Sequence, residues 1–193
     1  MGINRLGINL SGMPEVKPRS GILVIVGSAR CVWDDLDKVL SNDGNYYRRG
    51  PDIMCLNDMV MHFPGEVDHA YSNDDVWLPK WIAARRPRTE KDHPTAILQH
   101  TCQKGKGTQL VWPWPGHGTS GLNAVYTGIA LGYDQIILAG VPIDGSGHYF
   151  DPTWKQTNYE PQARYWKNAK QTIFDGKVKS LSGQTKEILN EGN

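Results

Sequence analysis

The sequence predicts an α/β fold, with a single doubly wound sheet of about six mostly parallel strands and helices on both faces. Short apolar runs rich in β-branched residues alternate along the chain with segments of helical periodicity, an alternation typical of parallel sheets. The first such unit is a strand, a glycine turn and a helix, as doubly wound folds usually begin. We therefore expect residues 21–193 to form one domain, preceded by an irregular, flexible arm over residues 1–20.

The strands are expected in the short apolar runs. The run at 21–27, GILVIVG, is continuously apolar and ends in glycine, as expected of a strand buried on both faces. The run at 135–140, QIILAG, is the clearest central strand. Further strands are expected at residues 52–57, 67–72, 95–100 and 178–181, with a short additional one at 109–112.

The helices are expected where apolar residues recur at intervals of three and four. The central helix begins at a capping hydroxyl, Thr119 or Ser120, and ends at Gly132, a residue type that commonly terminates helices. Gly128 allows this helix to pack closely on the sheet. The other helices are expected at residues 32–40, 77–86, 161–174 and 185–189.

The composition is that of an ordinary soluble protein, with 39% hydrophobic and 21% charged residues. The net charge of +1 lacks the basic excess of a general nucleic-acid binder, so it does not indicate a nucleic acid as partner or acceptor. No apolar run approaches the roughly 20 residues that span a bilayer, so we expect no membrane association and a cytoplasmic location. The three cysteines form no CxxC pair, which indicates free thiols and no metal site. The oligomeric state stays open.

Candidate ligand-binding groups stand at the ends of two strands and at the start of the central helix. Ser28 and Arg30 follow the first strand, where helix amides attract anions and an arginine binds phosphate; the alternative is an ordinary turn with a surface arginine. Asn57 ends the second strand and suits a ribose or a base, although an Asx turn explains it equally well. Ser120 and Gly121 open the central helix, where free amides form an anion cradle or merely accompany a cap.

The segment at 141–157 is too long for a simple connection and holds the candidate catalytic groups. His148 and Asp144 combine an imidazole and a carboxylate, which suits general acid–base work, and Tyr149 can donate to a phosphate. The alternative is a structured surface loop shaped by glycines and a proline. His117 reads as polar surface.

Two further groups of side chains favour structural roles. The tryptophans at 112, 114, 154 and 166 could stack a base or sugar, but for most of them packing of loops on the sheet is the better interpretation. We interpret the basic end of the predicted helix, with Arg85, Arg86 and Arg88, as exposed to solvent rather than as a binding site.

Residues 120–151, SGLNAVYTGIALGYDQIILAGVPIDGSGHYFD, resemble the corresponding stretch of the bacterial sialyltransferases of glycosyltransferase family 42. The same layout is found in the DUF115 family and in archaeal 6-hydroxymethylpterin diphosphokinase-like proteins. GILVIVGSARCV and IMCLND resemble the first two strand ends of that group. The whole chain, with its closing SLSGQTKEIL, is also similar to a set of uncharacterised phage-encoded proteins.

The resemblance implies a Rossmann-like domain that binds a nucleotide at the carboxyl ends of its strands. It implies ligand-binding roles for Gly27, Ser28, Asn57, Ser120, Gly121, His148 and Tyr149. The sequence departs from the group where GSARCV replaces GNGPSL and where Pro142 follows the central strand. No histidine stands near residues 158–159, where the sialyltransferases carry their catalytic one, so sialyl transfer itself is not expected.

Taken together, the sequence predicts a transferase that binds a nucleotide or nucleotide sugar and moves a glycosyl or phosphoryl-type group. His148 and Asp144 are the expected catalytic residues, and the nucleotide itself is the only small-molecule partner expected. The alternative is a non-catalytic protein that binds or sequesters a nucleotide. A third option, a domain that merely keeps the fold, also stays open, since fold does not dictate function.

Overall fold

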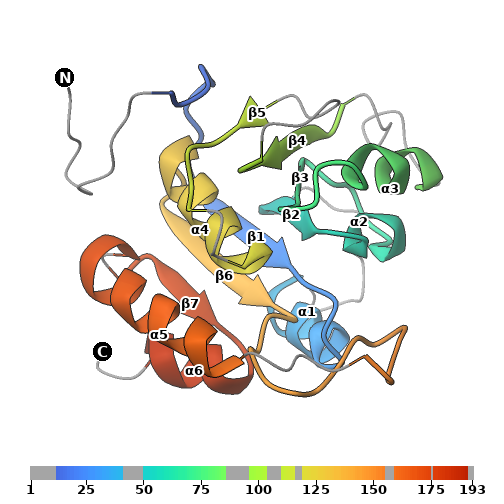
Figure 1. Ribbon diagram of the computed structural model, residues 1–193, viewed down its shortest axis with the longest axis vertical. Coiled ribbons are helices and arrows are strands. Elements are labelled where there is room, and N and C mark those ends of the chain that lie inside the picture. Colours follow the sequence, from blue (N-terminus) through green and yellow to red (C-terminus); the bar gives the residue numbers. More distant parts are fainter. Residues whose placement is uncertain are drawn as a thin grey trace.

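A single seven-stranded parallel sheet forms the centre of the computed structural model, which describes residues 12–40, 50–85, 96–103, 110–115, 119–154, 159–174 and 176–190 (Figure 1). The strands are β1 Ile22–Val26, β2 Asp52–Leu56, β3 His69–Tyr71, β4 Leu98–Thr101, β5 Leu110–Val111, β6 Gln135–Ala139 and β7 Val178–Ser180. Their order across the sheet is β5-β4-β3-β2-β1-β6-β7. This architecture confirms the predicted α/β class, with β5 as the short additional strand.

Strand β1 occupies the middle of the sheet because its side chains are apolar on both faces. Val24 pairs with Ile53 of β2 on one side and with Ile137 of β6 on the other, all in parallel. The chain runs outward from β1 to β5, then returns to place β6 on the opposite side of β1. The strand order therefore reverses between β1 and β6, which is the position where ligands bind in open α/β sheets.

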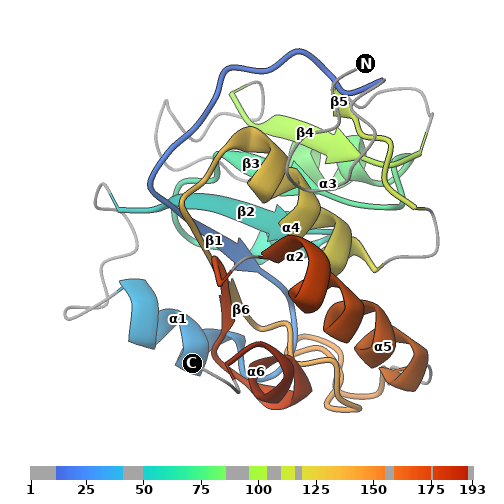
Figure 2. The same ribbon diagram turned by 90° about the vertical axis from the view of Figure 1, so that its left-hand side faces the viewer.

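The helices cover both faces of the sheet. One face packs against α1 Val32–Leu40, α2 Met59–His62 and α3 Leu78–Ala84. The other packs against α4 Ser120–Leu131, α5 Tyr159–Ala169, the π-helical turn Lys170–Phe174 and α6 Gly183–Asn190. Figure 2 shows α1 and α4 on opposite sides of the strands. None of the helices described is both long and apolar enough to span a bilayer.

Helix α4 follows its sequence signals. The Thr119 side chain accepts a hydrogen bond from the amide of Leu122, and Gly132 ends the helix with φ 99° in the left-handed region. A Cβ atom at Gly128 would lie 2.8 Å from a Leu23 methyl carbon and 2.9 Å from one of Ile136. The helix therefore sits against the sheet more closely than any other residue at that position would allow.

A buried chain of hydrogen bonds crosses β2, β3 and β4. Trp112 Nε1 donates to His100 Nδ1 at 3.0 Å, which fixes the remaining proton of a neutral His100 on Nε2. His100 Nε2 then donates to His69 Nδ1 at 3.0 Å, and His69 Nε2 donates to the Tyr133 hydroxyl at 2.9 Å. Tyr133 donates in turn to the Asp52 carboxylate. Every proton in the chain is thereby assigned, and both imidazoles are neutral.

The prediction that Arg85 lies at a solvated helix end is wrong. Arg85 is only 4% exposed, and its guanidinium donates to the carbonyl oxygens of Val60, Phe63 and Gly65. These carbonyls belong to α2 and to the residues that follow it, and the sequence did not indicate this short helix. Arg86 and Arg88 lie outside the described residues.

The described part of the N-terminal arm, residues 12–20, has no helix or strand but lies against the domain. Arg19 donates its amide to the carbonyl of Leu131 at 2.7 Å, and Met13 and Val16 pack against the hydrophobic core. Cys31, Cys55 and Cys102 are free thiols. Burial and the nearby Asp35 carboxylate raise the pKa of Cys31 to about 11.

Candidate functional site

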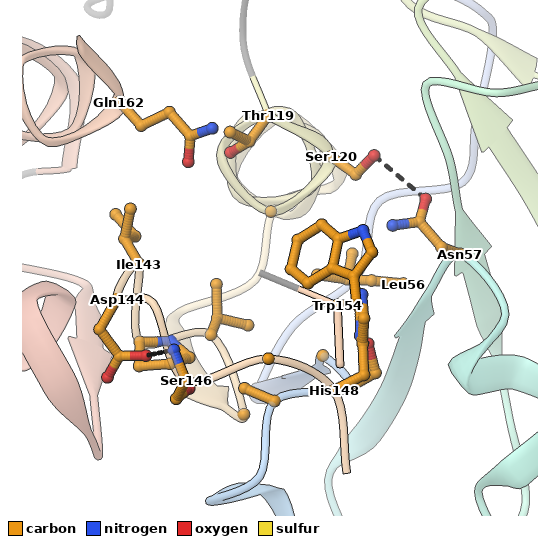
Figure 3. Close-up of a pocket in the computed structure, with 18 residues that line it drawn as sticks. Leu56, Asn57, Thr119, Ser120, Ile143, Asp144, Ser146, His148, Trp154 and Gln162 are labelled. Carbon is orange, nitrogen blue, oxygen red and sulfur yellow. Dashed lines mark hydrogen bonds between the residues drawn. The ribbon is translucent and has the colours of Figure 1, made fainter. Parts of the chain in front are cut away.

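A cavity of about 180 Å³ opens at the carboxyl ends of β1, β2 and β6, where the strand order reverses (Figure 3). Its walls come from the turn after β1, the end of β2, the start of α4, the segment after β6 and helix α5. The lining residues are Gly27, Ser28, Ala29, Leu56, Asn57, Thr119, Ser120, Gly121, Gly140, Val141, Pro142, Ile143, Asp144, Ser146, Gly147, His148, Trp154 and Gln162.

Two glycines let the first and sixth strands end in contact at the base of this cavity. A Cβ atom at Gly27 would lie 2.4 Å from the carbonyl oxygen of Gly140, and one at Gly140 would lie 2.7 Å from that of Gly27. Gly140 also adopts φ 67°, which favours glycine. The backbone of Gly27 and Gly140 therefore forms the floor of the cavity. The segments that follow β1 and β6 diverge from this point of contact.

Asn57 presents only hydrogen-bond donors to the cavity. Ser72 Oγ accepts from the amide of Asp74, and Ser120 Oγ accepts from the amide of Asn73, so both hydroxyls give their protons to Asn57 Oδ1. That fixes the orientation of the side-chain amide and leaves Nδ2 without an acceptor among the described residues (Figure 3). Asn57 also has φ 51°, a strained backbone conformation of the kind that gathers at functional sites.

The N-terminus of α4 adds two further donors. Leu122 and Asn123 donate their amides to Thr119, at the side-chain oxygen and the carbonyl respectively. The amides of Ser120 and Gly121 have no acceptor in the described part of the chain, and both residues line the cavity. With the macrodipole of a 12-residue helix behind them, these amides favour an anion.

Ser28 and His148 face one another across the cavity floor. Ser28 Oγ hydrogen-bonds to His148 Nδ1. The ring of His148 contacts two aromatic rings, that of Trp154 with centroids 4.1 Å apart and that of Phe150 with centroids 5.1 Å apart. Its Nε2 atom has no partner among the described residues, so one ring nitrogen is engaged and the other is open.

Most of the predicted site residues lie together. The cavity brings together Gly27, Ser28, Asn57, Ser120, Gly121, Asp144 and His148. Asp144 stands on another wall from His148, and its carboxylate accepts the amide of Ser146 at 2.9 Å (Figure 3). His117, which reads as polar surface, lies outside the described residues.

Arg30 and Tyr149 are not among the lining residues. Arg30 is exposed and donates to the carbonyl of Pro152 at 3.1 Å. The Tyr149 ring packs edge-on against Trp33 and His62, and burial raises its pKa to about 12. His148 forms an isolated antiparallel bridge with Ala29 and lines the cavity, whereas the ring of the next residue, Tyr149, packs on Trp33 and His62 instead.

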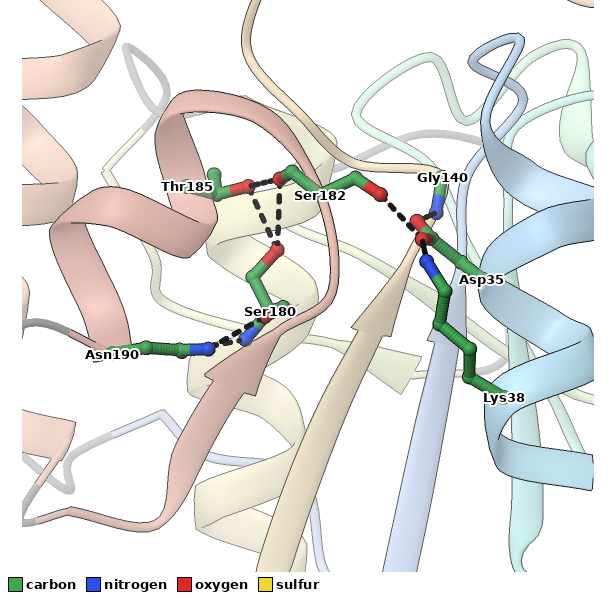
Figure 4. A network of polar contacts seen from close by, with 7 residues as sticks. All are labelled: Asp35, Lys38, Gly140, Ser180, Ser182, Thr185 and Asn190. Carbon is green, nitrogen blue, oxygen red and sulfur yellow. Dashed lines mark hydrogen bonds and ion pairs between the residues drawn. The ribbon is translucent and has the colours of Figure 1, made fainter.

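Sequence reasoning missed a polar network that anchors the start of the loop after β6 (Figure 4). The fully buried Asp35 carboxylate accepts from the amide of Gly140 at 3.0 Å and from the Ser182 hydroxyl, with Lys38 Nζ 3.3 Å away. Thr185 donates its amide to the carbonyl of Pro142 at 3.2 Å. The C-terminal segment thus fixes the loop that carries His148. Gln162, which lines the cavity from α5, had no sequence signal.

The packing interpretation of the tryptophans is confirmed for Trp112, Trp114 and Trp166, which are all buried. Trp154 differs, because it lines the cavity and is 44% exposed. Within the described ranges, no three His, Cys, Asp or Glu side chains gather closely enough to hold a metal ion.

Comparison with family models, curated proteins and solved structures finds no match. The resemblance to the sialyltransferase group therefore stays a prediction, and function has to be argued from the cavity.

Proposed function

We propose that the protein binds a nucleotide or a nucleotide-activated donor in this cavity and transfers a glycosyl or phosphoryl-type group to an acceptor. The observation that carries the proposal is a cavity at the strand reversal whose α4 and β2 side offers hydrogen-bond donors that have no acceptor among the described residues. Phosphate and sugar oxygens are acceptors, so donors are what a nucleotide requires. The predicted resemblance points to the same class of ligand.

The phosphate is assigned to the start of α4. The amides of Ser120 and Gly121, which have no acceptor in the described part of the chain, lie at the start of the helix, a position that attracts anions. Asn57 Nδ2 then donates to a ribose oxygen or to a carbonyl of the base. This assignment needs no charged side chain, which agrees with the scarcity of lysine and arginine among the lining residues.

The base is assigned to Trp154 at the rim. A cavity of about 180 Å³ is smaller than the roughly 300–1,000 Å³ that typically enclose a whole ligand, so only part of a nucleotide fits inside. An exposed indole at the rim offers a stacking surface for the rest, worth about 1–3 kcal/mol per base. Because stacking tolerates every base, this surface does not select among them.

His148 is assigned as the acid/base group, with Asp144 as a second ionisable group on the facing wall. The imidazole is held in place by its two ring neighbours and retains one unengaged nitrogen. Proton transfer by a positioned histidine contributes roughly 10²–10⁴-fold to a rate. If His148 transferred no proton, the same cavity would serve a protein that only binds or sequesters a nucleotide.

The binding half of the proposal is tested by thermal shift with CMP, UMP, GTP, NAD and nucleotide sugars. A ligand held by the folded state raises the melting temperature. Asn57→Asp keeps the shape of the side chain but replaces two donors with a carboxylate, so we expect its affinity for the same ligand to fall at least tenfold. No shift with any ligand, or equal affinity in the variant, would contradict the proposed site.

The catalytic half is tested with the ligand found in that screen. His148→Ala should keep the affinity within about threefold and lose turnover by about 10²-fold or more. His62→Ala is the matched control, because it removes an exposed histidine that does not line the cavity. Tight binding without turnover in the wild-type protein would instead support the sequestering function.

A further inference from the structure

We propose that Ser28 is a nucleophile activated by His148, and that it carries the transferred group as a covalent phosphoserine-type intermediate. The inference rests on the proposed function and deepens it, because it makes the transfer a double displacement through this side chain. The substrate class is a phosphoester or phosphoanhydride.

The first support is the position of Ser28. Ser28 directly follows Gly27 at the end of the central strand β1 and leads into the turn before α1. The sheet therefore fixes where Ser28 lies in the structure. It is 8% exposed and yet lines the cavity. Its hydroxyl has one partner among the described residues, which is His148 Nδ1. A serine hydroxyl paired with an imidazole at the edge of a cavity is the arrangement that nucleophilic catalysis requires.

The second support is that the backbone, not only the side-chain rotamers, holds the pair together. The amide of Tyr149 donates to the carbonyl of Ser28 at 2.9 Å. Ala29 and His148 form an antiparallel bridge, although they stand far apart in the sequence. The loop after β6 is thereby fastened directly to the residues around the hydroxyl, which is how a catalytic pair is pre-organised.

The third support is the surroundings of the imidazole. The Phe150 ring stacks on the imidazole with centroids 5.1 Å apart, and the Trp154 ring contacts it with centroids 4.1 Å apart. Aromatic neighbours stabilise the positive charge that an imidazole gains when it accepts a proton during a reaction. The half-buried Asp58 also acts on it: burial raises the pKa of this carboxyl, and the charge of His148 lowers it. The Asp58 carboxyl thus lies within electrostatic reach of the imidazole.

The fourth support is a set of backbone donors in the same cavity as the serine. Ser120 and Gly121 line this cavity, and their amides have no acceptor among the residues that the structure describes. Such donors stabilise the negative charge on the oxygens of a phosphoryl group under attack. The nucleophile, the base and the oxyanion donors therefore share one cavity of about 180 Å³.

The chemistry balances without a further reactant. In the first step Ser28 Oγ bonds to phosphorus as the bond to the leaving oxygen breaks, and the serine proton passes through His148 to that oxygen. In the second step an acceptor hydroxyl, or water, gives its proton to His148 and bonds to phosphorus. The Oγ–phosphorus bond then breaks, and the proton returns to Ser28.

The experiment treats the full chain with a fluorophosphonate reagent and maps the adduct by peptide mass spectrometry. We expect the mass increase on the peptide that contains Ser28, its absence in Ser28→Ala, and labelling at least tenfold slower in His148→Gln. His62→Gln is the matched control: it removes an exposed imidazole that stacks on Phe150 but does not line the cavity, so it should label at the wild-type rate and shows that the effect of His148→Gln does not come from disturbed ring stacking. Circular dichroism verifies that each variant is folded.

Absence of an adduct on Ser28 in the folded wild-type protein would overturn the inference, and so would equal rates in the wild type and His148→Gln. Should Ser28→Ala fail to fold, the mass map of the wild-type protein still decides which serine reacts. Nucleotide thermal shifts separate the two proposals. A shift without an adduct rejects only the covalent intermediate, whereas loss of both rejects the proposed function as well.

Discussion

The neutral pair His69 and His100 should make the free energy of unfolding fall as the solution becomes acidic. Both imidazoles are fully buried, and burial, with a smaller contribution from Arg19, lowers the pKa of His69 to about 4. Burial lowers the pKa of His100 as well. The hydrogen-bond chain reinforces this, because His69 Nδ1 and His100 Nδ1 are both needed as acceptors and protonation of either would break the chain.

The magnitude follows from linkage between protonation and folding. Between its unfolded pKa of 6.5 and its folded pKa of about 4, His69 binds a proton only in the unfolded chain, so stability is full above this window and falls within it as pH falls. Moving from about pH 7.5 to about pH 5.5 should cost about 1.4 kcal/mol for His69 alone. His100 adds a loss of the same sign.

Urea denaturation at these two pH values measures the effect. The loss should be smaller by about 1.4 kcal/mol in His69→Gln than in the wild type, and unchanged in His62→Gln, which replaces an exposed histidine. Burial raises the pKa values of Asp58 and Asp68, which opposes the histidine effect, but this cancels in the comparison. Equal losses in His69→Gln and the wild type would refute the argument. So would NMR spectra in which all the imidazoles titrate near the unfolded value.

Three further predictions concern the frame of the cavity, and urea denaturation checks each. Gly27→Ala should lower the free energy of unfolding by about 2 kcal/mol, because the added carbon would overlap the Gly140 carbonyl, whereas Gly145→Ala, with open space around it, should change it by under about 0.5 kcal/mol. Thr119→Ala removes the cap of α4 and should cost about 1 kcal/mol. Asp35→Ala should cost about 3 kcal/mol, but Lys38→Ala under about 0.5 kcal/mol, because the lysine is 56% exposed. Equal effects of Gly27→Ala and Gly145→Ala, or of Asp35→Ala and Lys38→Ala, would contradict these contacts, and so would an unchanged free energy of unfolding in Thr119→Ala.

The fold was predictable because its signals are local. Continuous apolar runs mark strands such as β1 and β6, and Thr119 and Gly132 mark the two ends of α4 by backbone chemistry that needs no tertiary contact. Helix α2 gave no such signal, because it spans four residues, too few for helical periodicity to show. It exists because the fold places its carbonyls around the guanidinium of Arg85.

The site was predictable in position but not in detail. Strand ends meet at one edge of a parallel sheet, so Ser28 and Asn57 could be assigned to it from the order of the elements. Which side chains enter the cavity depends on the path of the loop, and a step of one residue separates His148 from Tyr149. The hydrogen bonds of Asp35 could not be predicted either, because its partners Gly140 and Ser182 stand far from it in the sequence.

The cavity has two sides with different chemistry. The β2 and α4 side, with Asn57, Ser120 and Gly121, offers donors and no acid/base group, so it can hold a ligand but not transform it. The β1 and β6 side carries Ser28 and His148, fastened together through backbone contacts. Because the two sides lie on different elements, a substitution on one should leave the other in place. Affinity and turnover should therefore be separable by mutation, and that separation distinguishes a transferase from a protein that only sequesters its ligand.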